Sequence, residues 1–196
     1  MNPRLKLVRT SSRIILAIML TAAVAAVAQV ETIDAQARGT STQSGRQIGI
    51  KIIINQYSPP EDRQKLIDAF KKGGNDEMAR TLFKMKGVGR IQIPGTVGYT
   101  IAFARSIPTP TGRKIRFVTD RKIAFFEAAQ NTRSQSYNLT AGEVEINDQD
   151  KGKSTGVLYP AAQLGISNEG QLQFSLYQNP WQLVGIIDWT PKNKEQ

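Results

Sequence analysis

The sequence of 196 residues contains no cysteine and no histidine. Without cysteine it cannot form a disulfide framework, a thiol nucleophile or an iron–sulfur site, and zinc fingers are excluded as well. A Ser-His-Asp triad needs the missing histidine. Acid–base catalysis would therefore depend on carboxylates, lysine or tyrosine. We expect no cofactor and no metal site, and these absences favour a non-enzymatic role while leaving an enzymatic activity undecided.

The motifs G-x-S-x-G, S-x-x-K and H-E-x-x-H are also absent. The one dense acidic stretch contains Glu143 and Glu145, which share a strand face at period two and could perturb one another's pKa. A solvated strand face, with Val144 and Ile146 turned inward, is the interpretation we favour. The turn 148–152 only superficially suggests a calcium loop, because a lysine interrupts it and the distal glutamate of an EF-hand is missing.

The first 28 residues have the three-part pattern of a bacterial secretory signal peptide. An apolar run from Ile14 to Ala28 ends in Ala26-Val27-Ala28, and at 15 residues it is shorter than the roughly 20 needed to span a bilayer. We expect cleavage after Ala28 and export to the periplasm or the medium, with an uncleaved anchor as the alternative. The basic residues that precede or open this run are Arg4, Lys6, Arg9 and Arg13.

Export changes the charge that matters for function. The signal peptide contains four of the 26 basic residues and no acidic one, so cleavage leaves 22 basic against 16 acidic residues and lowers the net charge from +10 to +6. An exported protein rarely meets nucleic acid, so we expect no nucleic-acid partner. Once the signal is cleaved, we also expect no integral membrane segment.

The rest of the chain predicts a flexible linker at 29–45, a single domain at 46–190 and a C-terminal tail at 191–196. Isoleucines alternate along 48–54 and indicate a half-buried strand. Ser58-Pro59-Pro60-Glu61 is typical of a capped helix start. Gly73-Gly74 interrupts the helical pattern, which predicts a helical hairpin.

From Val88 onward short alternating segments are separated by turn residues. Gly142 is expected to mark a bulge. The order of elements predicts an α+β domain, a curved, mostly antiparallel β-sheet with one helical hairpin after the first strand. A sandwich and a partly closed barrel both fit the spacing. The expected strands centre on 91–93, 99–104, 115–117, 123–126, 136–146, 155–159, 172–176 and 183–189.

A basic cluster on one predicted hairpin is the most distinctive constellation. Lys114 and Arg116 share the face opposite Ile115 and Phe117, so the hairpin could present a cationic stripe to an anionic lipid headgroup, cell-wall polymer or acidic protein. The alternative is an edge hairpin protected from aggregation by charge and salt-bridged to Glu143 and Glu145. The candidate binding residues are Arg105, Arg113, Lys114, Arg116, Arg121 and Lys122.

Several segments together resemble a family of uncharacterised exported proteins from soil bacteria, notably acidobacteria. The resemblance covers most of 47–190 and implies export and a single domain, but no activity and no catalytic residue. The segments are 57–70, 84–89, 98–105, 116–121 and 125–128.

These observations predict an exported envelope protein, a non-enzymatic binding or structural module with a basic hairpin at 105–122. A small apolar-ligand carrier and a carboxylate-based hydrolase are the alternatives, with the ligand held between the curved sheet and the helical hairpin.

Overall fold

The structure is a computed structural model that describes residues 30–40, 43–123, 139–168, 172–178 and 180–191. The predicted signal peptide, the strand segment at 125–126 and nearly all of the tail lie outside these residues. The strands are β1 Glu31–Arg38, β2 Gln47–Ile54, β3 Gly89–Gln92, β4 Tyr99–Thr109, β5 Gly112–Thr119, β6 Leu139–Asn147, β7 Thr155–Ile166, β8 Leu172–Gln178 and β9 Trp181–Asp188, and the helix is α1 Pro60–Lys84.

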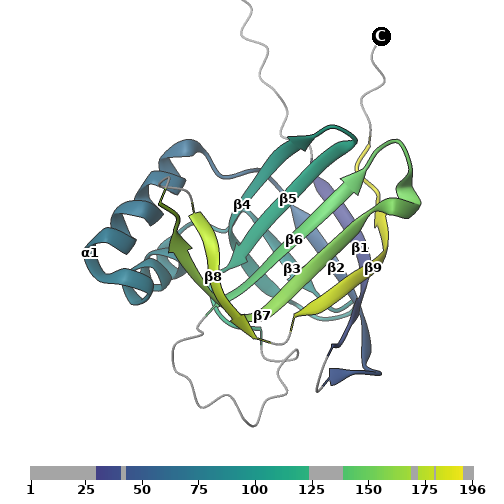
Figure 1. The fold of residues 1–196 in the computed structure, drawn as a ribbon, viewed down its shortest axis with the longest axis horizontal. Coiled ribbons are helices and arrows are strands. Elements are labelled where there is room, and N and C mark those ends of the chain that lie inside the picture. Colours follow the sequence, from purple (N-terminus) through teal and green to yellow (C-terminus); the bar gives the residue numbers. More distant parts are fainter. Residues whose placement is uncertain (1–29, 41–42, 124–138, 169–171, 179, 192–196) are drawn as a thin grey trace, which may run out of the picture.

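Eight antiparallel strands close into a barrel (Figure 1). Strands β1 to β6 pair in sequence order, β6 pairs with β7, β7 with β9, and β9 with β1. The mostly antiparallel sheet is confirmed. Of the two predicted architectures, the sandwich is not formed, and the barrel is closed rather than partly closed. Because β7 is twelve residues long, its first part pairs with β9 and its second part pairs with β8, which therefore lies beside the barrel.

Side chains fill the interior of the barrel. Alternate residues of each strand point inward, including Phe117 and Trp181, which are almost completely buried. An eight-stranded barrel is just wide enough for its own side chains to fill it. The interior is therefore a packed core. The other large members of this core are Ile33, Ile50, Ile52, Ile54, Ile91, Ile101, Ile115, Val144, Ile146, Leu158, Leu183 and Ile186.

Strand β1 lies within 29–45, so the prediction of a linker over that whole segment was wrong. Its inward residues include Ile33, Ala35 and Ala37, all buried. The alternation is present in the sequence, but alanine has a low strand propensity and gave a weak signal. Because β1 precedes the isoleucine-rich strand β2, the helix follows the second strand rather than the first.

Helix α1 packs on the outside of the barrel (Figure 1). Leu66, Met78 and Leu82 are fully buried against outward-facing residues of the barrel wall and against β7. The expected break is found, because Gly73 and Gly74 have non-helical backbone angles and kink the element. At Gly74, φ is +63°, a value that favours glycine.

The start of α1 differs from the predicted capping box. Pro59 is the N-cap residue, and no side chain caps the first turn. The Ser58 hydroxyl instead accepts a hydrogen bond from the Ala104 N–H at 3.1 Å. Ser58 therefore ties the helix entry to β4.

Gly142 does not mark a bulge. The irregular pairing of β6 with β7 falls between Leu139 and Ala141. A Cβ atom at Gly142 would lie 2.3 Å from Cζ of Phe117 on the paired strand β5. The glycine is required because the Phe117 ring packs directly on its Cα.

Candidate functional site

The six basic residues of the predicted hairpin do not lie on one face. Arg113 shares the inward face of β5 with Ile115 and Phe117 and lies at one end of the barrel core. Its Nη2 donates to Asp188 at 2.8 Å and to Glu31 at 3.2 Å. Arg113 therefore belongs to an ion cluster at the barrel end and not to an outward stripe.

The outward residues of β5 are paired with β6. Lys114 Nζ lies 3.1 Å from Glu143 and 3.2 Å from Glu145, and Arg116 Nε donates to Glu143 at 2.6 Å. These contacts confirm the predicted salt bridges of Lys114 and Arg116. The prediction of an edge hairpin was wrong, because β4 also pairs with β3 and β5 with β6. Val144 and Ile146 are buried, so the two glutamates lie on the outer face of β6 as expected.

The last two basic residues follow β5. Arg121 Nη1 lies 3.6 Å from Oδ2 of Asp120, and the guanidinium carbon of Arg121 is 5.6 Å from the centre of the Tyr99 ring. Lys122 is partly buried immediately before the core residue Ile123. The structure therefore distributes the hairpin's charge over three separate environments.

Glu143 is held as a charged, paired carboxylate. Burial alone would raise the pKa of Glu143, but hydrogen bonds and charge from Arg116 and Lys114 outweigh it and leave the pKa below its ordinary value. A general acid or base works best with a pKa near the operating pH. The pKa of Glu143 is instead shifted downward, away from neutrality.

Arg105 differs from its neighbours. It lies on β4 directly opposite Arg116 of β5, and it is partly buried. Burial lowers the pKa of the Arg105 guanidinium, and the positive charges of Arg63 on α1 and of Arg116 lower it further. Among the residues that the structure describes, no carboxylate forms an ion pair with Arg105.

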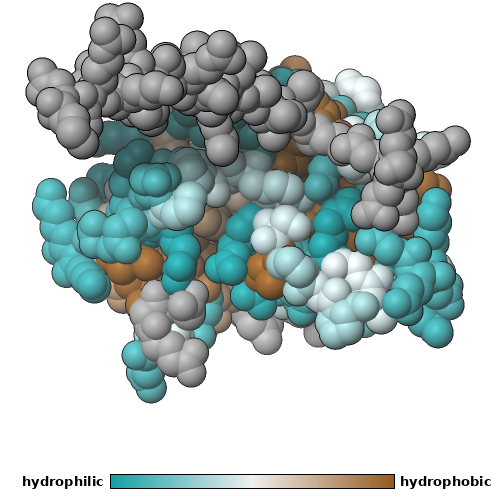
Figure 2. Space-filling view, turned by 90° about the horizontal axis from the view of Figure 1, so that it is seen from above, coloured by the Kyte–Doolittle hydropathy of each residue, from teal (hydrophilic) through white to brown (hydrophobic). Residues whose placement is uncertain are grey.

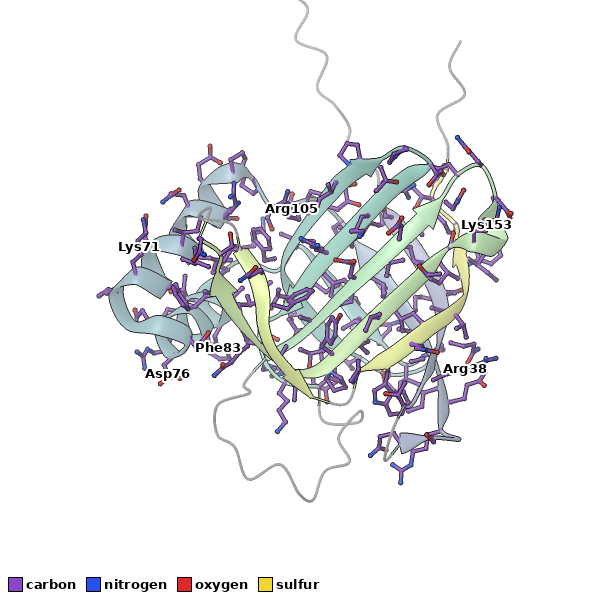
Figure 3. The ribbon with its side chains drawn as sticks, in the orientation of Figure 1. Arg38, Lys71, Asp76, Phe83, Arg105 and Lys153 are labelled. Atoms are coloured by element: carbon purple, nitrogen blue, oxygen red, sulfur yellow. The ribbon has the colours of Figure 1, made fainter. Side chains whose placement is uncertain are left out.

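A cavity of about 290 Å³ lies on the outer side of the barrel wall, between that wall and β8. We call it the side pocket. It exists because the second part of β7 leaves the barrel and carries β8 with it. Figure 3 shows Arg105 on the side of the barrel where α1 and β8 lie. The pocket is lined by Phe103, Arg105, Arg116, Phe117, Val118, Glu143, Tyr159, Leu164, Leu172, Gln173 and Phe174.

The strand register gives the side pocket a charged row and an apolar row. Arg105, Arg116 and Glu143 are successive partners across β4, β5 and β6. Phe103 and Val118 are partners in the adjacent outward row of β4 and β5. The pocket can therefore contact a polar group and an apolar group at once.

The apolar walls of the side pocket were not identified as a site from the sequence. The ring centres of Tyr159 on β7 and Phe174 on β8 lie 5.2 Å apart. In the sequence these residues have the same pattern as core residues of any strand. Strand β7 continues to Ile166, beyond the strand expected at 155–159, and its sequence contains no pattern that marks this extension as a site.

Other apolar exposure is scattered. On the face seen in Figure 2, hydrophobic residues form small patches among hydrophilic ones, where the residues are described. The large exposed apolar side chains include Phe83 on α1, Val97 between β3 and β4, and Trp189 directly after β9. Single exposed apolar residues of this kind need no functional explanation.

Asp120 is expected to lower stability at neutral pH. Burial raises its pKa, the nearby Arg121 opposes this only in part, and Oδ1 is buried with no hydrogen-bond partner among the described residues. A carboxyl group with a raised pKa loses its favourable contribution as pH rises through the folded pKa. We therefore expect Asp120→Asn to raise the free energy of unfolding at pH 7 by about 0.5 kcal/mol, with the gain shrinking below pH 4.

Urea denaturation at pH 7 and at pH 3.5 measures this effect, and Asp188→Asn is the matched control. Burial acts to raise the pKa of Asp188 too, but hydrogen bonds from Thr190 and Arg113 outweigh it and lower the pKa. The control should therefore destabilise the protein at pH 7. A loss of stability in Asp120→Asn comparable with that in the control would contradict the argument.

No group of three or more acidic residues among the described residues is arranged to hold a metal ion. In the same part of the chain, no helix combines the length and the apolar character that a membrane span requires. Searches of family models, curated proteins and solved structures found no match to this chain. The side pocket is therefore interpreted from its own geometry.

Proposed function

We propose that this protein is an exported, non-enzymatic binding module and that the side pocket is its ligand site. The observation that carries the proposal is the pocket itself, about 290 Å³ between the barrel wall and β8, with aromatic and aliphatic walls. Small-molecule sites are mostly apolar concavities with a few polar groups that orient the ligand. The side pocket has this composition, and its volume suits a small ligand.

The packed barrel interior supports this location. Trp181, Phe117 and the surrounding isoleucines occupy the space that larger or emptier barrels use for ligands. A ligand inside the barrel would have to displace these side chains. The side pocket offers a concave surface without such rearrangement.

The charge pairing argues against the two other candidate functions. A carboxylate-based hydrolase needs an acid or base with a pKa near neutrality, whereas Arg116 and Lys114 hold the pKa of Glu143 low. A broad cationic stripe for a polymer or a membrane needs unpaired charges, whereas Lys114 and Arg116 are paired and Arg113 lies in the barrel end. A small ligand in the side pocket is consistent with all of these contacts. Export is proposed from the signal-peptide pattern of the first 28 residues.

A titration with 1-octanol, followed by NMR of methyl-labelled leucines, tests the proposal. We expect saturable shifts at Leu164 and Leu172, which line the side pocket. Leu172→Trp should weaken binding by roughly tenfold or more, because the indole ring occupies the space that the ligand needs. Leu172 is partly exposed on β8, so the larger side chain can be accommodated without unfolding the barrel.

Ile187→Trp is the matched control, because it places the same ring at an exposed position of β9, outside the pocket lining. It should leave the affinity for 1-octanol unchanged. Absence of saturable shifts at the two leucines in the wild-type protein would refute the side pocket as a ligand site. Equal affinities of Leu172→Trp and wild type would refute it as well.

A further inference from the structure

We propose that the side pocket selects a small amphipathic anion, and that Arg105 binds its anionic head while the apolar row holds its tail. This inference rests on the proposed function of the pocket. It adds the chemical class of the ligand, a carboxylate or phosphate with a short apolar chain. It also assigns the residue that sets the specificity.

Arg105 is the one positive charge at the pocket that the neighbouring carboxylates of the described residues do not pair with. Glu143 accepts a hydrogen bond from Arg116 and forms an ion pair with Lys114, and Glu145 forms an ion pair with Lys114. Two carboxylates are thus shared by two cations on the outer face of β5 and β6. Arg105 adds a third positive charge to the same row, and no carboxylate of the described residues forms an ion pair with it.

The surroundings of Arg105 favour an anion. Partial burial removes water from the guanidinium, and Arg63 and Arg116 repel it, as the lowered pKa of Arg105 reflects. An anion placed beside Arg105 would relieve this repulsion and replace lost hydration with charge-assisted hydrogen bonds. The planar guanidinium fork matches the oxygen geometry of a carboxylate or a phosphate.

The apolar row fixes the size and nature of the tail. Phe103 and Val118 lie next to Arg105 and Arg116 in the strand register, so a head at Arg105 directs the rest of the ligand along apolar side chains. A water molecule occupies about 30 Å³ in the liquid. If each non-hydrogen atom of a ligand needs a similar space, the side pocket of about 290 Å³ holds about ten of them. Octanoate, with its eight carbon and two oxygen atoms, has about this size.

Four probes with eight carbon atoms each test the head group: octanoate, octyl phosphate, 1-octanol and octylamine, each titrated into the wild-type protein at low salt. We expect octanoate to bind about tenfold more tightly than 1-octanol, and octylamine to bind more weakly than either. The ratio of the affinities for octanoate and octyl phosphate shows which anionic head group fits the pocket better. Raising the salt concentration should weaken the two anions and leave 1-octanol nearly unchanged.

Variants at Arg105 test its role. Arg105→Gln should abolish the preference for octanoate over 1-octanol. Arg105→Lys should retain part of the preference, because the charge remains and the planar fork is lost. Arg90→Gln removes the same charge at an exposed position of β3, outside the pocket lining, and should behave as wild type. Circular dichroism checks that each variant is folded.

The outcomes separate the inference from the proposed function. Equal binding of octanoate and 1-octanol by the wild type would overturn the anion preference and leave the pocket as an apolar site. Tighter binding of octylamine would overturn it in favour of Glu143 as the head-group residue. A preference for octanoate that survives in Arg105→Gln would overturn the assignment to Arg105. Failure of all four probes to bind would overturn the proposed function itself.

Discussion

Gly142→Ala is expected to lower the free energy of unfolding by about 3 kcal/mol, because the new methyl group would overlap a buried ring. The added Cβ atom would lie 2.3 Å from Cζ of Phe117 and 2.6 Å from its Cε1. Phe117 is fully buried in the barrel core, and an aromatic ring cannot bend away as a flexible side chain can. Either the ring or strand β6 must therefore move.

Urea denaturation of wild type, Gly142→Ala and Gly49→Ala measures the effect. Gly49 is a suitable control, because it is also a strand glycine and a Cβ atom there meets only the Gln36 side chain at 3.6 Å. We expect Gly49→Ala to change stability by less than about 0.5 kcal/mol.

A double variant identifies the source of the strain. Phe117→Leu alone should destabilise the protein by removing buried area. Combined with Gly142→Ala, it should cost clearly less than the sum of the two single changes, because the smaller side chain leaves room for the methyl group. Simple additivity, or a Gly142→Ala variant as stable as the control, would contradict direct packing of the ring on the glycine.

Arg113→Met is the second change with a large expected effect. Arg113 is one-fifth exposed, and its partners Glu31 and Asp188 are about one-tenth exposed. Removing the cation leaves two largely buried carboxylates facing one another at the barrel end. Breaking a buried ion pair costs about 3–5 kcal/mol, and the partial exposure of this cluster reduces our expectation to about 2–3 kcal/mol at pH 7.

The pH dependence of this loss follows from Asp188. Although burial acts to raise the pKa of Asp188, hydrogen bonds from Thr190 and Arg113 and the charge of Arg113 hold it below its ordinary value. A depressed carboxylate pKa contributes stability above the unfolded-state pKa of about 4 and loses it as the pH falls through the folded-state pKa. The difference between wild type and Arg113→Met should therefore shrink below about pH 4.

Lys114→Met provides the control for Arg113→Met. The two residues are adjacent on β5, but Lys114 points outward and pairs with Glu143 and Glu145 near the surface. Surface pairs contribute about 0.2–1 kcal/mol, so this variant should be only slightly less stable than wild type. Thermal and urea unfolding from pH 3 to pH 8 measure the stability of Arg113→Met, Lys114→Met and wild type. Equal losses in the two variants would contradict the assignment of Arg113 to a buried cluster.

The sequence predicts the strands whose inward residues are large and branched. Strand β2, with Ile50, Ile52 and Ile54 inward, and strand β5, with Ile115 and Phe117 inward, are found where alternation places them. Strand β1 was missed because its inward positions are partly alanine. Periodicity reports burial only where the buried residue is clearly apolar.

Closure of the barrel and the side pocket depend on contacts that periodicity does not encode. Strand β1 pairs with β9, so Ala37 lies opposite Leu183 although 146 residues separate them along the chain. The side pocket depends on β7 changing partners from β9 to β8 along its length. Arg113 could not be assigned to the interior from the sequence either, since a charged residue at the end of a strand is normally taken to be solvated.

The charge pairing of the hairpin was foreseen in part. Glu143 and Glu145 were expected to pair with the basic residues across the sheet, and Lys114 and Arg116 make these contacts. The distinct position of Arg105 was not foreseen, because it depends on Arg116 lying directly opposite and on Arg63 of α1 approaching it. Both neighbours are fixed only by the folded structure.

Our central proposal is that the side pocket binds an amphipathic anion. Intermolecular nuclear Overhauser effects between the protein and octanoate in solution test it most directly. We predict contacts from the octanoate chain protons to the rings of Phe103 and Phe174 and to the methyl groups of Val118. The protons nearest the carboxylate should contact the Arg105 side chain. Contacts confined to other residues, or their absence at saturating octanoate, would contradict the proposal.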